Sequence, residues 1–261
     1  GPGLKAVEMF QAVREGKIRA LWIMATNPAV SLPDAGLVRE ALSRCPMVIV
    51  SDVMAWNDTS RFAHVRLPAL AWGEKDGTVT NSDRRISRQR AFLPLPGEAK
   101  PDWWIIGEAA KRMGYADGFN FVSAHEVFDE HARLSTYRNK DTRCFDIGSL
   151  AGMSRDEFDQ MAPVQWPLRK NGESVARLFT TGRYYHPDGK ARFIPTSPRG
   201  PVNAPDAEFP LVLNTGRIRD QWHTMTRTGL SPKLANHIPE PYVDMHPHDA
   251  LMSGVRDGEL V

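Results

Sequence analysis

The chain has 261 residues, 41% hydrophobic and 25% charged, a balance typical of folded globular proteins that excludes wholesale disorder. Its 33 basic and 31 acidic side chains leave a formal net charge of +2, which gives no reason to expect nucleic acid as a partner. No signal peptide and no apolar run of about 18 residues is present, so we expect no membrane span. The two cysteines, Cys45 and Cys144, have no metal-binding spacing, and they fit a reducing compartment.

The first 115 residues alternate between helical and strand patterns. Short, nearly continuous apolar runs are typical of buried parallel strands, and apolar residues three and four apart are typical of helices. Such alternation predicts an α/β layer with a mostly parallel sheet and helices on both faces. The expected helices cover residues 4–13, 34–42 and 102–113, and the expected strands cover residues 18–25 and 47–50. Asp102 is expected to cap the last of these helices.

Two further regions follow. Residues 116–205 read as a helical and irregular connection, with Ser123 and Ser154 each placed three residues before a glutamate, as in a capping box. Residues 206–261 form a third region. It opens on the apolar run 209–213, which we expect to be a strand, and it ends on 257–261, which we expect to be a turn leading into a strand.

Polar residues directly follow the two predicted strands. Asn27 comes after the first, and Ser51 and Asp52 come after the second. In an open α/β sheet, ligands bind beyond the carboxyl ends of the strands. An amide and a carboxylate there suit a nucleobase edge or a ribose. Ordinary turn chemistry is the alternative, because Asn and Asp favour turns.

Two later segments are also rich in polar groups. Lys75 lies beside a predicted turn at Asp76 and can meet a phosphate; the basic residues that follow it are otherwise a solvated loop. Residues 214–228 combine threonines, arginines, Trp222 and His223. So many hydroxyl and guanidinium donors suit a polyoxygenated, anionic ligand.

Other motifs give weaker evidence for a functional site. The cluster DMHPHD at 244–249 has no complementary metal-binding segment, and the GxGxxA pattern at residues 1–6 has no preceding strand. No arrangement suited to nucleophilic catalysis stands out. We therefore assign neither a metal ligand nor a catalytic residue.

Together, several segments resemble the molybdenum oxidoreductases that carry a bis-molybdopterin guanine dinucleotide cofactor, and among them the cytoplasmic assimilatory nitrate reductases. The segments are LWIMATNPAVSLPD, VIVSD, NSDRRISRQRAFLPLPGEAKPDWW and LVLNTGRIRDQWHTMTRTG. The resemblance implies that residues 206–261 begin a double-psi β-barrel that binds the dinucleotide. It also implies that the parent enzyme reduces nitrate to nitrite at molybdenum.

The resemblance further implies which residues hold the guanine, ribose, pyrophosphate and pterin parts of the cofactor. Either Asp52 or Asp102 would accept hydrogen bonds from the guanine. The implied cofactor-binding residues are Asn27, Ser51, Asp52, Lys75, Asp102, Thr215, Gly216, Arg217, Trp222, His223 and Thr224.

The chain also departs from that family. It has no cysteine cluster for a [4Fe–4S] centre and no cysteine in the context of a molybdenum ligand, so we expect the cluster only in a full-length protein and no activity from this chain alone. An electron-donor protein or domain would dock elsewhere. Two alternatives stay open: a formate dehydrogenase or other enzyme of the same cofactor family, and a stand-alone nucleotide-binding module.

Overall fold

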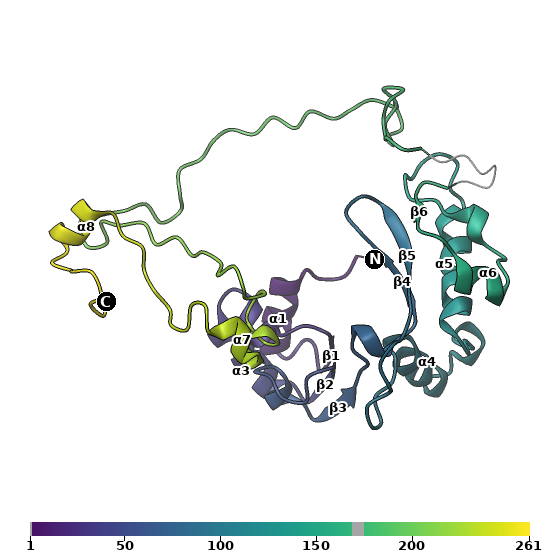
Figure 1. Ribbon diagram of the computed structural model, residues 1–261, viewed down its shortest axis with the longest axis horizontal. Helices are drawn as coiled ribbons and strands as arrows, with labels where there is room; N and C mark the ends of the chain where they lie inside the picture. Colours follow the sequence, from purple (N-terminus) through teal and green to yellow (C-terminus); the bar gives the residue numbers. More distant parts are fainter. Residues whose placement is uncertain (1, 169–174) are drawn as a thin grey trace.

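The computed structural model describes residues 2–168 and 175–261 (Figure 1). Within these ranges, no helix is both long enough and apolar enough to cross a membrane. The α-helices are α1 (Ala6–Arg14), α2 (Pro28–Ser31), α3 (Ala35–Arg44), α4 (Asp102–Arg112), α5 (Ala124–Thr136), α6 (Arg155–Gln160), α7 (Pro232–Ala235) and α8 (Pro247–Met252). The strands are β1 (Ala20–Met24), β2 (Met47–Asp52), β3 (Val65–Pro68), β4 (Gly77–Thr80), β5 (Arg85–Gln89) and β6 (Val164–Gln165).

The predicted parallel sheet is confirmed. Strands β1, β2 and β3 pair in parallel in that order. A parallel bridge between Ala69 and Lys100 continues the sheet beyond β3, just before α4 begins. The carboxyl ends of successive strands therefore lie along one edge, and the chain turns there after β1, after β2 and after Lys100.

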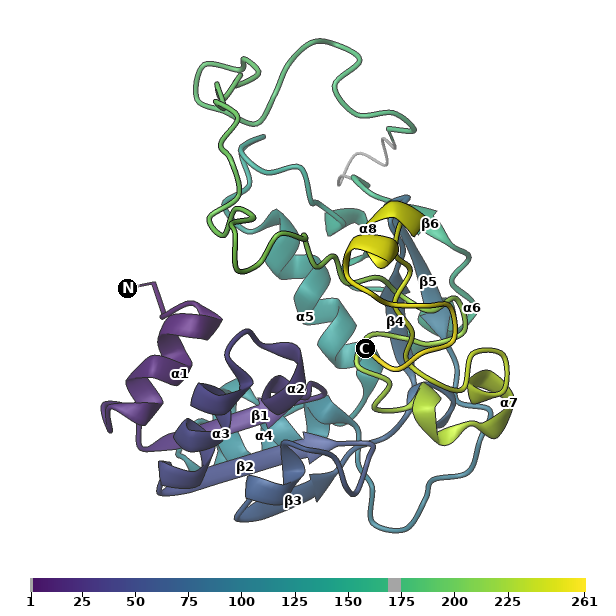
Figure 2. The same ribbon diagram turned by 90° about the vertical axis from the view of Figure 1, so that its left-hand side faces the viewer.

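One face of this sheet carries the first hydrophobic core. Phe10 and Val13 of α1 and Val38 and Leu42 of α3 pack against the buried side chains of β1 and β2. In both views α4 lies on the opposite side of the strands from α1 and α3 (Figures 1 and 2).

The residues that cap the helix N-termini agree with the expectation from the sequence, with one exception. The Ser123 and Ser154 hydroxyls accept hydrogen bonds from the backbone N–H three residues on, as expected, and Asp34 caps α3 in the same way. The expectation that Asp102 caps α4 is wrong. Pro101 occupies the cap position, and Asp102 is the first helical residue, with its carboxylate held by Lys75 at 2.9 Å.

An antiparallel sheet, which the sequence did not suggest, forms the second layer. Strands β4 and β5 make a hairpin, and β6 joins its outer side. Ile86 of β5 packs into a second core with Phe128, Ile147 and Phe158. The basic segment read as a solvated loop is therefore a structural hairpin that holds α5 and α6.

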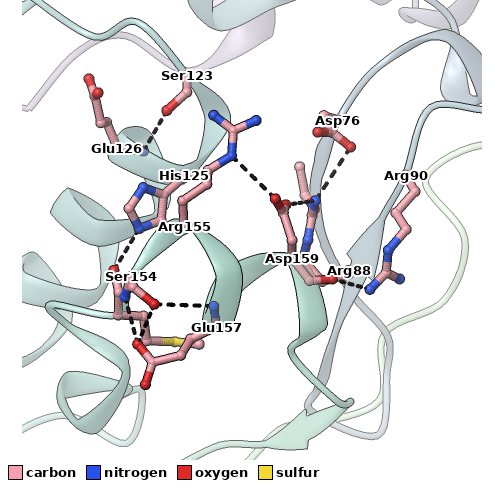
Figure 3. Close-up of polar contacts among 12 residues, drawn as sticks. Asp76, Arg88, Arg90, Ser123, His125, Glu126, Ser154, Arg155, Glu157 and Asp159 are labelled. Carbon is pink, nitrogen blue, oxygen red and sulfur yellow. Dashed lines mark hydrogen bonds and ion pairs between the residues drawn. The ribbon is translucent and has the colours of Figure 1, made fainter.

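Buried Arg88 ties this hairpin to α6 (Figure 3). Its side chain is 2% exposed and donates to Asp159 at 2.9 Å, with its guanidinium 4.1 Å from the centre of the Phe158 ring. Burial alone would raise the pKa of Asp159, but hydrogen bonds from Arg88 and Arg155 outweigh it and hold that pKa below its ordinary value. The Arg88 charge thus serves internal packing.

The strand expected at 209–213 is wrong. Residues 257–258 form the expected turn, but no strand follows it. Residues 209–213 and 259–261 are irregular and exposed, as is most of the chain between residues 190 and 216. Figure 1 shows this part as a long extended trace between the α5 region and the neighbourhood of α8. An apolar stretch becomes a strand only when another strand satisfies its backbone N–H and C=O groups, and among the described residues no strand pairs with residues 209–213.

Candidate functional site

A cavity of about 790 Å³ lies between the carboxyl edge of the parallel sheet and the C-terminal segment 217–227. Its size is within the range of about 300–1,000 Å³ usual for small-molecule and cofactor sites. The lining residues are Ala25, Thr26, Asn27, Val30, Ser31, Asp52, Arg217, Trp222, His223, Thr224, Thr226 and Arg227. The site therefore has two walls, drawn from segments almost 200 positions apart in the chain.

The sheet positions the first wall. The Ala25 N–H donates to the Ser51 carbonyl at 2.9 Å, so the chain leaving β1 stays beside the end of β2. Ala25 itself adopts a left-handed conformation, with φ of 54°, and turns the backbone there. Asn27 and Asp52 consequently line one cavity, as the sequence led us to expect.

Asn27 is only 7% exposed, and its amide is fully engaged. Its Oδ1 accepts from the Thr59 N–H at 3.1 Å and from the Thr59 hydroxyl at 2.7 Å. Its Nδ2 donates to Thr226 Oγ1 at 3.0 Å and to Asp58 Oδ2 at 3.4 Å. An Asn side chain offers two acceptor sites and two donors, so its capacity is used within the protein.

Asp52 differs, because its carboxylate keeps free capacity toward the cavity. Oδ1 accepts from the Met54 N–H at 2.9 Å, and Oδ2 accepts from Asn57 Nδ2 at 3.2 Å. A carboxylate has about four lone-pair sites, so each oxygen can accept a further hydrogen bond. The two internal bonds fix the orientation of the group while leaving it able to bind a ligand.

The second wall supplies cations and an aromatic face. The Arg217 guanidinium lies 5.0 Å from the centre of the Trp222 ring, and Trp222 is 60% exposed. His223 sits edge-on to Trp222, with ring centres 4.4 Å apart, and has a φ of 48°. Non-glycine residues with positive φ cluster at ligand sites, where the surrounding structure holds the strain. With Arg227, this wall suits an anionic ligand that has a planar base.

A polar cluster supports this wall from outside. Asp220 contacts Arg219 Nε at 2.9 Å and His237 Nδ1 at 2.8 Å. The hydrogen bond from Arg219, assisted by His237, holds the pKa of Asp220 below its ordinary value. The backbone N–H of Trp222 donates to Thr228 Oγ1 at 3.1 Å, which closes the turn.

Five residues expected in the site do not line this cavity: Ser51, Lys75, Asp102, Thr215 and Gly216. Ser51 is fully buried, and its hydroxyl accepts from the Trp22 indole N–H at 2.8 Å. Thr215 and Gly216 are exposed and lie just before the second wall begins at Arg217.

Lys75 and Asp102 form a separate pair near the neighbouring strand end that follows Lys100. Both side chains are about one-third exposed, and the Lys75 ammonium is 2.9 Å from Asp102 Oδ2. Among the atoms that the structure describes, the buried Asp102 Oδ1 has no hydrogen-bond partner. An unpaired carboxylate oxygen beside a cation can accept a hydrogen bond from a ligand.

The sequence did not single out Ser31 in the lining or Thr59 behind it; Thr226 and Arg227 lie in the donor-rich segment 214–228 but were not among the expected cofactor-binding residues. The run Asn57 to Ser60 after β2 carries the turn residues that could have marked the supporting loop. No signal pointed to the pairing of Asn27 with Thr226. In residues 2–168 and 175–261 no group of three or more His, Cys, Asp or Glu side chains could hold a metal.

Comparisons with known families match two separate segments of the chain, and each segment contains one wall of the cavity. Residues 1–112 match the family described as molybdopterin oxidoreductase. Residues 211–261 match the molydopterin dinucleotide binding domain. The first match contains the sheet wall of the cavity, and the second contains the C-terminal wall.

The individual sequence relatives of the chain are reductases and dehydrogenases by name. The chain is 54% identical to a nitrate reductase of Klebsiella oxytoca, 34% to an assimilatory nitrate reductase catalytic subunit of Bacillus subtilis, and 33% to a formate dehydrogenase subunit alpha of Methanocaldococcus jannaschii. Each comparison covers 99% of this chain but only 29–36% of the relative. Acetylene hydratase from Pelobacter acetylenicus shares the fold, with a TM-score of 0.67 at 20% identity over 97% of this chain and 35% of that one.

Proposed function

Because this chain belongs to the molybdopterin oxidoreductase family, we propose that it is the segment of a nitrate reductase that holds molybdopterin guanine dinucleotide. One observation carries the proposal. The two walls of the cavity come one from each of the two matched segments, so the site exists only where both segments meet.

The lining suits the parts of such a cofactor. Asp52 can accept hydrogen bonds from guanine N1–H and N2–H, and the Trp222 face can contact a flat ring. Arg217 and Arg227 can bind the pyrophosphate oxygens through paired N–H groups. Asp102, with its unpaired oxygen beside Lys75, is the second candidate for the guanine. When bound, the cofactor supplies the redox chemistry that converts nitrate, with two electrons and two protons, into nitrite and water.

We propose the same three-part organisation that the sequence indicated. Residues 1–115 are the α/β part of the cofactor site, residues 116–205 connect, and residues 206–261 begin the dinucleotide-binding β-barrel. A [4Fe–4S] cluster, the molybdenum ligand and the contact with an electron donor would come from other parts of such an enzyme. Cys45 and Cys144 are free thiols, which fit a cytoplasmic enzyme.

Nitrate is favoured over formate by sequence similarity. Nitrate reductases reach 54% and 45% identity to this chain, whereas the formate dehydrogenases reach 33% and 32%. The same cofactor serves both groups of relatives in our proposal, so the cavity itself does not separate the two substrates.

The activity is tested on the holoenzyme that contains this chain. We expect nitrite to form from nitrate with reduced methyl viologen as electron donor, and no reduction of oxidised viologen by formate. The metal-free protein is the control in both assays. Formate oxidation without nitrite formation would refute the nitrate assignment, while leaving the cofactor assignment in place.

A further inference from the structure

We propose that Asn27 is a positioning residue. Its hydrogen bond to Thr226, which we call the latch, holds the C-terminal wall at the sheet edge, and Asn27 does not itself hydrogen bond the bound ligand. This inference rests on the proposed function for the identity of the ligand, but the latch itself is a property of the ligand-free protein. It assigns to Asn27 a different role from the ligand contact suggested by its place after β1.

The hydrogen-bond inventory of Asn27 is the first step. Both acceptor sites of Oδ1 are taken by Thr59, and both donors of Nδ2 are taken by Asp58 and Thr226. With a side chain that is 7% exposed, Asn27 could contact a ligand only by giving up one of these bonds. A buried polar group left unpaired is costly, so the internal bonds prevail.

The second step is how few hydrogen bonds join the two walls. Within the described parts of residues 2–115 and 206–261, the bond from Asn27 Nδ2 to Thr226 Oγ1 is the one hydrogen bond between the two segments, and no ion pair joins them. Thr226 connects this bond to a further lining residue, because its hydroxyl lies 2.9 Å from that of Thr224, which lines the cavity. The hydrogen-bonded connection between the two walls is therefore made by the Asn27 amide.

Asn27 also orders the first wall. Its Oδ1 fixes Thr59, and the Thr59 hydroxyl in turn accepts from the Ala29 N–H at 3.1 Å. A single side chain thus connects the turn after β1, the loop after β2 and the C-terminal segment. Such a role requires two donors and two acceptors in one short side chain, which Asn provides and Asp does not.

Hydrogen–deuterium exchange of the ligand-free protein tests the latch. Thr226→Val keeps the shape of the side chain but removes the acceptor, and Asn27→Ala removes the donor. We expect exchange in peptides covering 222–230 to become about two- to ten-fold faster in each variant, with no further increase in the double variant. The Thr59 amide should lose protection in Asn27→Ala only. The exposed Asn214→Ala serves as the control and should match wild type.

Two results would overturn the latch. One is wild-type exchange over 222–230 in Thr226→Val; the other is additive acceleration in the double variant, which would mean that the residues act independently. GDP titration provides a second readout: Thr226→Val should weaken binding, and Asn27→Ala should weaken it no more than the double variant Thr59→Val/Thr226→Val, which removes the Asn27 hydroxyl partners on both walls. A larger loss in Asn27→Ala than in that double variant would show a direct ligand contact. If GDP fails to bind even wild type, the proposed function is in doubt, and the exchange data still decide the latch.

Discussion

Replacing Asp52 with asparagine is expected to weaken GDP binding by about ten-fold or more. The loss of one charge-assisted hydrogen bond corresponds to roughly 1.5–3 kcal/mol. The new amide offers one acceptor and one donor, so one of the two guanine N–H groups would face another N–H. Titration calorimetry of Asp52→Asn against wild type measures the change in affinity.

The variant also disturbs the protein itself. Whichever way the amide turns, its NH2 group faces the Met54 N–H or the Asn57 NH2 group, so we expect a lower melting temperature as well. Asn57→Ala removes the internal bond yet keeps the carboxylate, and it is the matched control. It should lower the melting temperature while retaining most of the affinity. Unchanged affinity in Asp52→Asn, with a loss in Asp102→Asn, would reassign the guanine contact to Asp102.

Replacing Phe158 with alanine is expected to lower the free energy of unfolding by about 3–5 kcal/mol. Phe158 is 1% exposed, and its ring packs 5.2 Å from that of Phe128 and 5.4 Å from that of His125. Truncation would leave a cavity and would also uncover the buried Arg88 guanidinium, which lies over the ring. Urea unfolding measures the loss.

A second phenylalanine provides the comparison. Phe193 is 93% exposed in the extended segment, so Phe193→Ala should change the free energy of unfolding by no more than about 0.5 kcal/mol. A cost below about 1 kcal/mol for Phe158→Ala would mean that the second core does not depend on this ring.

The parallel layer could be predicted because its signals are local. The apolar runs that became β1 and β2 are continuous in the sequence, and the turn residues after them mark where the strands end. The positions of Asn27 and Asp52 followed from that topology. Their separate roles did not, because the partners that occupy the Asn27 amide are 31, 32 and 199 positions away.

The hairpin of β4 and β5 shows the opposite case. Its strands are polar, and Ile86 is the one aliphatic side chain of β5 to enter the second core. Charge dominates that segment in the sequence, yet Arg88 is buried because acceptors from β4 and α6 surround it. Conversely, the apolar run 209–213 has strand character but no partner strand among the described residues, so local pattern alone misled the prediction there.

A crystal structure of the protein with GDP tests the two-walled site most directly. We predict that the nucleotide lies between the sheet edge and segment 217–227, with its guanine against the Asp52 carboxylate and its diphosphate near Arg217 or Arg227. The Asn27 bonds to Thr59 and Thr226 should remain intact. GDP bound away from this cavity, or held by one wall while the other stays apart, would contradict the account.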